Sequence, residues 1–298
     1  MCAKKASMAQ RSERKDARRT KGAKPVVFVI GAGKVGTALV RSLRRAGVVA
    51  RLRPARSRLP SAIRADLIVL AVRDRELGRL ARDLAERGIV PKNAAVVHVS
   101  GAVGADVLEP LRGACAGVGQ MHPMIAFASL RFAPALAGGN VRVEGDRRAV
   151  ALGKRVARLL GMTPRNLPGL DTVAYHAAAG LVANGAAALA ALGAQLLHSA
   201  GVENEVTSEL LGPLLRSVAD NVAALGFPAA LTGPVRRGDV RALEGHVEVL
   251  RNKLPQVVRF YLAAAEAQLP LARAVGEARS ADLDEMARVI ARETSRLH

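Results

Sequence analysis

The stretch Val26-Val-Phe-Val-Ile-Gly-Ala-Gly-Lys-Val-Gly36 decides the fold of the first half of this chain. Its five leading β-branched or aromatic residues predict a fully buried strand. Glycines follow in the order G-x-G-x-x-G, and residues 37–46 then have the composition of a helix that ends at Gly47. A strand, a glycine turn and a helix in this order are the context that a dinucleotide-binding turn requires.

Each glycine of this turn has its own expected role. Gly31 permits the tight bend, Gly33 lets backbone N–H groups approach a diphosphate, and Gly36 lets the helix pack close to the strand. The unpaired N–H groups at the start of the helix attract phosphate. We therefore expect a dinucleotide to be bound by the residues of the turn, Gly31, Ala32, Gly33, Lys34, Val35 and Gly36. The alternative is a tight turn of an α/β protein that binds nothing.

The residues after the second predicted strand, 48–52, decide between NAD and NADP. An NAD site carries an acidic residue here to bind the ribose hydroxyl. This chain instead has Arg53, Arg56 and Ser57, and guanidinium groups bind phosphate bidentately. We therefore expect NADP rather than NAD as the cofactor, with these three residues on its 2′-phosphate. A basic surface loop is the alternative.

Length and composition predict a soluble protein of about two domains. The chain has 298 residues and two cysteines, which are too few for a disulfide framework and fit a reducing cytoplasm. No apolar stretch near the start resembles a secretory signal. The apolar window 177–197 is interrupted by Asn184 and Gln195, so we expect a helix buried inside protein and no membrane span.

The net charge of +20 does not by itself indicate a nucleic-acid partner. Residues 1–24 hold nine Lys and Arg against two acidic residues and have few apolar ones, which predicts a disordered basic tail. No aromatic residues alternate with the basic ones, and no recognition helix or zinc pattern occurs. We expect no specific nucleic-acid partner; an arm that binds nucleic acid through this tail is the weaker alternative.

Alternating strand and helix patterns predict an α/β domain with a doubly wound parallel sheet. Strands are expected at 66–72, 94–100, 118–122 and 141–144, with helices at 76–87 and 146–160. From residue 167 only helices are expected, at 171–200, 203–225, 237–250, 254–267 and 282–297. The predicted parts are a tail (1–24), an NAD(P)-binding Rossmann domain (25–166) and an all-α domain (167–298) for substrate binding and dimerisation. Its long apolar helix predicts a homodimer.

Candidate site residues lie beyond the carboxyl ends of the predicted strands, where doubly wound sheets bind ligands. Ala71 and Val72 end the third strand and Ser100 ends the fourth, so we expect them to contact the cofactor. His122 and Pro123 follow the fifth strand and are candidates for substrate contact.

The long helix adds His176 and Asn184, which share one broad side of it. A histidine, an asparagine and Ser100 around a nicotinamide ring would suit proton transfer as hydride moves. We expect His176 to donate the proton while Asn184 and Ser100 orient the substrate. A hydrogen-bonded core histidine is the alternative.

A turn-rich segment, 231–239, contributes Thr232, Gly233 and Asp239 as a possible wall of a small-molecule substrate site. The alternative for Asp239 is the cap of the next helix. No histidine pair has i, i+4 spacing and no cysteine cluster occurs, so we expect no metal site.

Six quoted segments together resemble one family. They are Gly31–Gly36, Val99-Ser-Gly-Ala102, His122-Pro-Met-Ile-Ala-Phe127, Val143-Glu-Gly-Asp146, Tyr175-His-Ala-Ala178, and Thr232-Gly-Pro-Val-Arg-Arg-Gly-Asp239. The chain resembles Rossmann-like proteins whose helical half is domain of unknown function 2520. These are similar to NADP oxidoreductases of the 6-phosphogluconate dehydrogenase, ketopantoate reductase and pyrroline-5-carboxylate reductase type.

This resemblance implies an NAD(P)-dependent oxidoreductase, often dimeric, with a 6-phosphogluconate dehydrogenase-like helical domain. It implies hydride transfer to or from a small carbonyl, imine or hydroxyacid. The long helix lacks the lysine that acts as an acid in hydroxyacid dehydrogenases, and His176 occupies the corresponding place. The alternative is a non-catalytic NADP-binding sensor or scaffold protein, because fold does not fix function.

Overall fold

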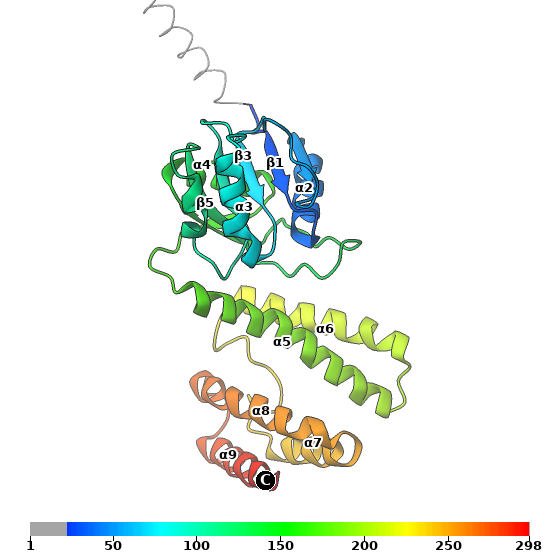
Figure 1. Cartoon of the computed structure of the whole chain (residues 1–298). Coiled ribbons are helices and arrows are strands. Elements are labelled where there is room, and N and C mark those ends of the chain that lie inside the picture. The colour runs from blue at the N-terminus through cyan, green and yellow to red at the C-terminus, as the bar shows by residue number, and fades with distance from the viewer. Residues whose placement is uncertain (1–22, 298) are drawn as a thin grey trace, which may run out of the picture. The chain divides into compact units, whose positions relative to one another are not determined.

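The computed structural model describes residues 23–297, which form two compact units (Figure 1). The first unit extends to Gly180 and the second begins at Leu181, so they meet inside the long helix α5 (Thr172–Ser199). The boundary predicted between residues 166 and 167 stays a prediction. Nearly all of the predicted basic tail, residues 1–22, lies outside the described residues.

The first unit is built on a seven-stranded sheet in the order β2-β1-β3-β4-β5-β6-β7. The strands are β1 (Val27–Ile30), β2 (Ala50–Arg53), β3 (Leu67–Leu70), β4 (Ala95–His98), β5 (Gly117–Pro123), β6 (Asn140–Gly145) and β7 (Thr163–Arg165). Strands β1 to β5 are parallel, which confirms the α/β prediction. The prediction of a parallel sheet throughout is wrong at β6, which is antiparallel to β5. The segment 124–139 between them forms no crossover helix, and a parallel pairing requires a crossover.

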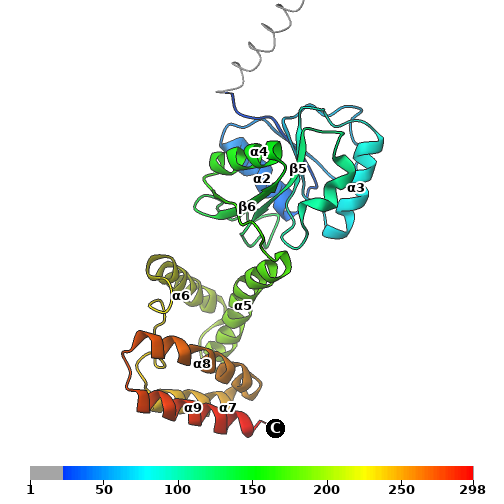
Figure 2. The same ribbon diagram turned by 90° about the vertical axis from the view of Figure 1, so that its left-hand side faces the viewer.

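Helices cover both faces of this sheet (Figure 2). Helices α2 (Lys34–Arg45) and α4 (Arg147–Leu159) lie on one side, and α3 (Asp74–Glu86) lies on the other with the 3₁₀ helix η1 (Ala105–Leu111). A hydrophobic core lies on each face of the sheet. Strand β1 contributes to both, with Val27 and Val29 in one core and Phe28 and Ile30 in the other. All four residues of β1 are buried, as its unbroken apolar run predicts.

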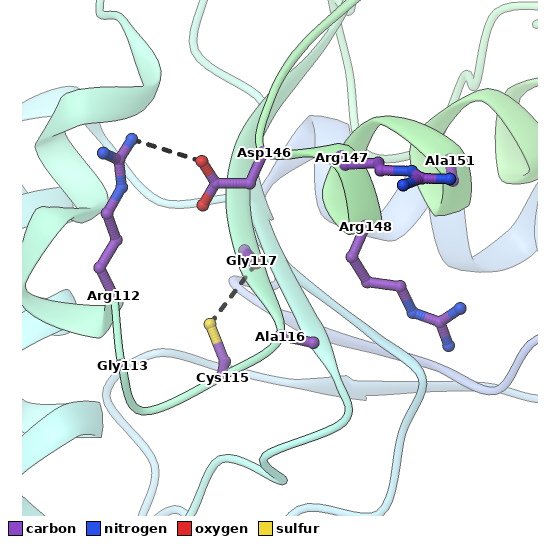
Figure 3. Close-up of a pocket in the computed structure, with 9 residues that line it drawn as sticks. All are labelled: Arg112, Gly113, Cys115, Ala116, Gly117, Asp146, Arg147, Arg148 and Ala151. Carbon is purple, nitrogen blue, oxygen red and sulfur yellow. Dashed lines mark hydrogen bonds and ion pairs between the residues drawn. The ribbon is translucent and has the colours of Figure 1, made fainter.

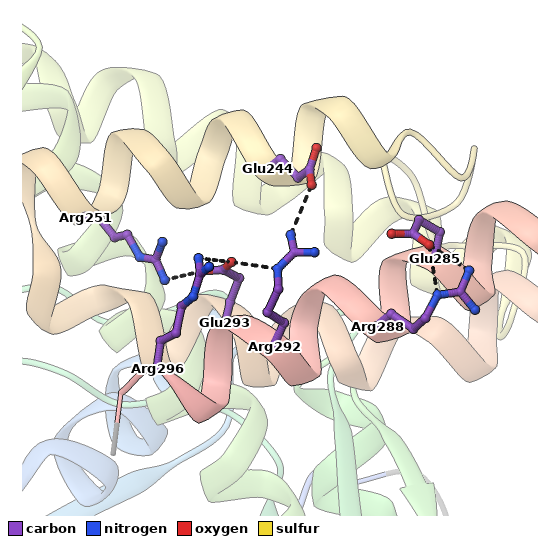
Figure 4. Close-up of polar contacts among 7 residues, drawn as sticks. All are labelled: Glu244, Arg251, Glu285, Arg288, Arg292, Glu293 and Arg296. Atoms are coloured by element: carbon purple, nitrogen blue, oxygen red, sulfur yellow. Dashed lines mark hydrogen bonds and ion pairs between the residues drawn. The ribbon is translucent and has the colours of Figure 1, made fainter.

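The second unit is helical, as expected, and contains α6 (Asn204–Leu225), α7 (Val240–Lys253), α8 (Pro255–Val275) and α9 (Ser280–Ser295). Its core lies among α7, α8 and α9, around residues such as Leu243, Val258 and Met286. A buried carboxylate also joins α7 to α9: Glu293 forms ion pairs with Arg251, Arg292 and Arg296 (Figure 4).

Helix α5 was expected to be buried inside protein, but none of its residues is buried in the described chain. Helix α6 buries only Thr207. By length and composition α5 is apolar enough to cross a membrane, with a mean hydropathy of 1.6 over its most apolar window. The neighbouring helices of the same chain do not cover its apolar residues, and burial of α5 between subunits stays a prediction.

Candidate functional site

The glycine turn after β1 has the geometry that its sequence predicts. Gly31 has φ +119°, and a Cβ there would lie 2.2 Å from the Ala71 carbonyl oxygen. A Cβ at Gly36 would lie 2.0 Å from the Gly31 oxygen. At Gly33, by contrast, no atom lies within 4 Å of the Cβ position. Two of the glycines therefore allow close packing, and the third leaves open space.

That open space lies at the start of α2. Gly33 is the N-cap residue, and no side chain caps the helix. The first N–H groups of a helix have no partner within it, and together with the helix dipole they favour an anion. The turn therefore fits a diphosphate group, with room for it where a larger residue would place its side chain.

The other predicted cofactor residues lie at the same edge of the sheet. The backbone N–H groups of Gly31 and Ala71 donate to Arg53 and Ile30, which joins the ends of β1, β2 and β3. Arg53 ends β2, and Arg56 and Ser57 follow it with exposed side chains. Val72 lines a cavity of about 310 Å³ beyond β3. The cofactor roles of these residues, and of Ala32, Lys34 and Val35, stay predictions.

Two predicted site histidines, one of them the penultimate residue of β5, lie close together. The ring centroids of His122 and His176 lie 6.2 Å apart. A Cβ placed on Gly101 would lie 2.6 Å from His122 Nε2 and 2.8 Å from His176 Nδ1. Both rings therefore pack closely against Gly101, where any larger residue would overlap them.

Tyr175 supports His122 from the side. Its hydroxyl lies 3.2 Å from His122 Nδ1, and the two rings meet edge to face at 5.5 Å. Burial, together with the positive groups of His176 and Arg142, lowers the pKa of His122 to about 4. Burial also raises the pKa of Tyr175. At neutral pH the site therefore presents an uncharged imidazole hydrogen-bonded to an uncharged phenol.

Arg142 of β6 lies behind this pair and is 3% exposed. Its guanidinium forms an ion pair with Glu144, lies 3.3 Å from Thr172 Oγ1 and sits 5.5 Å from the centre of the Tyr175 ring. These contacts fix the first turn of α5 against the sheet of the first unit. Arg142 was not among the predicted site residues; the available signal was one arginine between two valines of a predicted strand.

Ser100 belongs to the turn that carries Gly101. Its hydroxyl accepts a hydrogen bond from Ala102 N at 3.2 Å, and its backbone N–H donates to His98 Nδ1 at the same distance. Its carbonyl accepts from Gln120 Nε2 at 2.6 Å. His98 is fully buried, and burial lowers its pKa. These contacts hold the turn in place, and the predicted role of Ser100 in orienting substrate stays a prediction.

The remaining predicted residues have these positions. Pro123 ends β5. Asn184 lies on α5, in the second unit, and is exposed. Thr232 and Gly233 precede α7, and Asp239 caps it by accepting from Ala242 N at 3.1 Å. The cap is confirmed, whereas the substrate roles of these residues stay predictions.

A cavity of about 650 Å³ lies at the opposite edge of the sheet (Figure 3). Arg112, Cys115 and Asp146 line it, beside the start of α4. The Asp146 carboxylate accepts from Val118 N at 2.9 Å and faces Arg112 at 3.6 Å, and burial raises the pKa of Cys115. Strands β1 and β5 are parallel, so their carboxyl ends lie at one edge of the sheet and their amino ends at the other. The glycine turn and the histidines lie at the carboxyl ends, whereas this cavity lies at the start of β5 and is separate from them.

Two family models match separate segments of the chain. Residues 50–123 match the model of a Rossmann-like domain, and residues 140–268 match a domain of unknown function, DUF2520. No curated protein matches the chain.

Three solved structures have a similar fold. A Bacteroides fragilis protein named as a candidate NADP oxidoreductase is 22% identical, with a TM-score of 0.63 over 82% of this chain and 98% of that one. A Thermotoga maritima protein is 21% identical, with a TM-score of 0.60 over 84% and 99%. The Plasmodium falciparum pyrroline carboxylate reductase, solved with NADP bound, is 15% identical, with a TM-score of 0.53 over 81% and 95%. The chain thus matches the Rossmann-like model and the DUF2520 model over two separate segments.

Proposed function

We propose that this chain is an NADP-dependent oxidoreductase that transfers a hydride to or from a small carbonyl, imine or hydroxyacid. The observation that carries the proposal is the open space at Gly33 beside the uncapped start of α2. Gly33 and Lys34 are exposed there, so a phosphate group can reach the backbone N–H groups from solvent. The name of the solved Plasmodium falciparum reductase, which includes bound NADP, agrees with this cofactor.

The residues of the first unit have distinct roles in this proposal. The turn from Gly31 to Gly36 holds the diphosphate, and Arg53, Arg56 and Ser57 hold the 2′-phosphate. Bound NADPH supplies the hydride. His122 and His176 contact the reacting group of the substrate and hold the proton that accompanies the hydride.

Calorimetry of NADPH and NADH binding tests the cofactor. We expect wild type to bind NADPH at least about tenfold more tightly, since a guanidinium–phosphate contact contributes about 1.5–3 kcal/mol. Arg53→Ala should weaken NADPH binding and leave NADH binding unchanged. Arg158→Ala, which removes an exposed arginine from the end of α4, is the control for lost net charge. Equal affinities for the two nucleotides would remove NADP from the proposal, and no binding at millimolar concentration would remove the proposal itself.

The histidine pair favours a catalyst over a non-catalytic sensor. A sensor needs only a nucleotide site, whereas here two histidine rings lie 6.2 Å apart next to the turn that carries Ser100 and Gly101. We expect NADPH oxidation with at least one compound from a panel of small ketones, imines and hydroxyacids. His176→Ala should abolish that turnover while leaving NADPH affinity unchanged. Undiminished turnover would contradict its role as proton donor.

We also propose that the protein is a homodimer in which a second copy covers α5 and α6. The exposed residues Leu210, Leu214, Val218 and Val222 recur every four positions along α6 and form one apolar stripe, and α5 exposes Leu181 and Val182. Helix α6 also carries charges such as Arg216 and Asp220, so a protein surface suits it better than a bilayer.

Light scattering after gel filtration tests this assembly. Wild type should have twice the 31.2 kDa mass of the chain. Leu214→Glu with Val218→Glu should produce monomers, while Arg216→Glu, which changes charge on the same helix, should not. A monomeric wild type, or one that associates with lipid vesicles instead, would contradict the dimer. The cytoplasmic location stays a prediction.

A further inference from the structure

Two fully buried polar side chains lie next to the β4 turn, residues 100–104, which leads from β4 to η1. His98 ends β4, and Gln120 of β5 is its register partner. Both side chains are 0% exposed, although polar side chains are seldom buried without specific partners. Two residues earlier on the same strands, Val96 and Val118 belong to the core that η1 covers. His98 and Gln120 therefore share this face of the sheet with η1.

The hydrogen-bond partners of these side chains determine which atoms carry protons. The Ser100 N–H donates to His98 Nδ1 at 3.2 Å, so that nitrogen carries no proton. His98 Nε2 lies 3.1 Å from the Gly104 carbonyl oxygen, which can only accept, so Nε2–H donates to it. Gln120 Nε2 donates to the carbonyl oxygens of Ser100 at 2.6 Å and Val103 at 2.9 Å. The two buried side chains therefore hold both ends of the β4 turn.

The stability of the core does not explain the glutamine. Gln120 Oε1 is buried and has no hydrogen-bond partner among the described residues. Leaving a buried acceptor unpaired costs free energy comparable to what the two bonds of the amide nitrogen contribute. A methionine of similar size would fill the same space without the unpaired oxygen, but it could not donate to the two carbonyls. What Gln120 adds is therefore a fixed conformation of the β4 turn.

The β4 turn packs directly against the candidate site. A Cβ on Gly101 would lie 2.6 Å from His122 Nε2 and 2.8 Å from His176 Nδ1, so the Gly101 backbone is already in contact with both rings. Moving this backbone would remove the contact and open the half-buried ring of His122 to water. The places of both imidazole rings therefore depend on the β4 turn, and through it on His98 and Gln120.

We propose that Gln120 and His98 are positioning residues of the oxidoreductase, which fix the β4 turn and thereby hold the rings of His122 and His176 in place. This proposal rests on the proposed function, which gives those two histidines their part in the reaction. Gln120 and His98 are completely buried, so they act through the turn and touch no substrate. A small misplacement of reacting groups lowers the rate strongly, whereas nucleotide binding at the glycine turn does not depend on it.

Gln120→Met tests the proposal, because methionine keeps the length of the side chain and lacks the amide donors. The readout is the pH titration of His122, followed by NMR of its ring in the full chain. Burial and positive neighbours lower the pKa of His122 to about 4. The groups that act on its charge stay in the variant: His176, Arg142, His98 and Asp74. A loosened turn lets water reach the ring, so the midpoint of its titration should rise by at least about one pH unit.

Leu152→Ala is the matched control. Leu152 lies in α4 and is buried in the core on the other face of the sheet, so its loss lowers stability without touching the β4 turn. The titration of His122 should not move in this variant. Wild type provides a second measurement, which tests the bond to His98. The Ser100 N–H lies outside any strand, yet it should exchange slowly with solvent deuterium, and at least about tenfold faster in Gln120→Met.

Turnover of a compound from the panel completes the test. Gln120→Met should lower kcat at least about tenfold with KM and NADPH affinity unchanged, while Leu152→Ala keeps the kcat of wild type. The proposal is overturned if the His122 titration does not move, if the Ser100 N–H of wild type exchanges as fast as an exposed loop amide, or if Gln120→Met keeps its kcat. A wild type that binds no NADPH or turns over no compound contradicts the proposed function instead, so the two failures are distinguishable.

Discussion

Replacing Gly33 by alanine should separate nucleotide binding from folding. Its backbone, at φ −77° and ψ −172°, lies in a region that alanine adopts freely, and its Cβ would contact nothing within 4 Å. The cost is confined to the helix N-cap, where alanine is worse than glycine by about 0.5–1 kcal/mol. We expect the melting temperature to fall by no more than about 3 °C.

Nucleotide affinity should fall much further in Gly33→Ala. The added methyl group occupies the open space at the start of α2, where a diphosphate would approach the backbone N–H groups. A hydrogen bond to a charged group contributes about 1.5–3 kcal/mol. Losing one such bond corresponds to about 10- to 100-fold weaker NADPH binding.

Gly36→Ala is the matched control with the opposite profile. Its Cβ would lie 2.0 Å from the Gly31 carbonyl oxygen, and backbone cannot move aside as a flexible side chain can. Relieving that overlap should cost about 3 kcal/mol or more of unfolding free energy.

Urea denaturation and NADPH calorimetry of the two variants provide the measurements. The reasoning is refuted if Gly33→Ala binds NADPH as tightly as wild type, because the open space would then not be a phosphate site. It is also refuted if Gly36→Ala is as stable as wild type, because the helix would then not depend on that close approach.

Two further predictions concern stability. The folded pKa of His122, about 4, lies below its unfolded value near 6.5, so its stabilising effect is present above pH 6.5 and is lost as pH falls towards 4. Because His122 is partly exposed, its contribution is discounted for solvent screening. Between pH 7 and pH 4 the unfolding free energy of wild type should drop by about 2 kcal/mol more than that of His122→Gln. Equal pH slopes of the two proteins in urea titrations would contradict this. Glu293→Leu should lower the free energy of unfolding by about 2–3 kcal/mol, because the Glu293 carboxylate is 6% exposed and faces three arginines (Figure 4). Glu285→Gln, in an exposed ion pair, should change it by less than about 0.5 kcal/mol. Similar urea midpoints for the two variants would contradict this prediction.

The fold of the first unit could be predicted where it depends on residues that are neighbours in the sequence. An unbroken apolar run, a glycine turn and an amphipathic helix follow one another within twenty residues, so β1, the turn and α2 could be placed from sequence. Strand direction is not local in this way. Residues 140–145 have the composition of a strand in either direction, and only the missing crossover helix before them indicates an antiparallel pairing.

Only part of the candidate site could be predicted, because some of its contacts join residues that are far apart in the sequence. His122 and His176 could be predicted because one follows the fifth predicted strand and the other lies on the long predicted helix. Tyr175 belongs to one of the segments that resemble the family, but its hydrogen-bond partner His122 is 53 residues away, and no spacing rule links the two. Arg142 could not be predicted because an arginine in a strand usually reaches solvent, whereas here it is buried against Tyr175.

The unexpected direction of β6 determines the electrostatics of the site. Antiparallel pairing places Arg142 directly opposite His122. Glu144, two residues further along β6, shares the face of Arg142 and forms an ion pair with it. A register shift by one residue would place a valine opposite His122 and turn the guanidinium to the other face of the sheet. The low pKa of His122 and the position of the guanidinium over the Tyr175 ring therefore both depend on this one strand pairing.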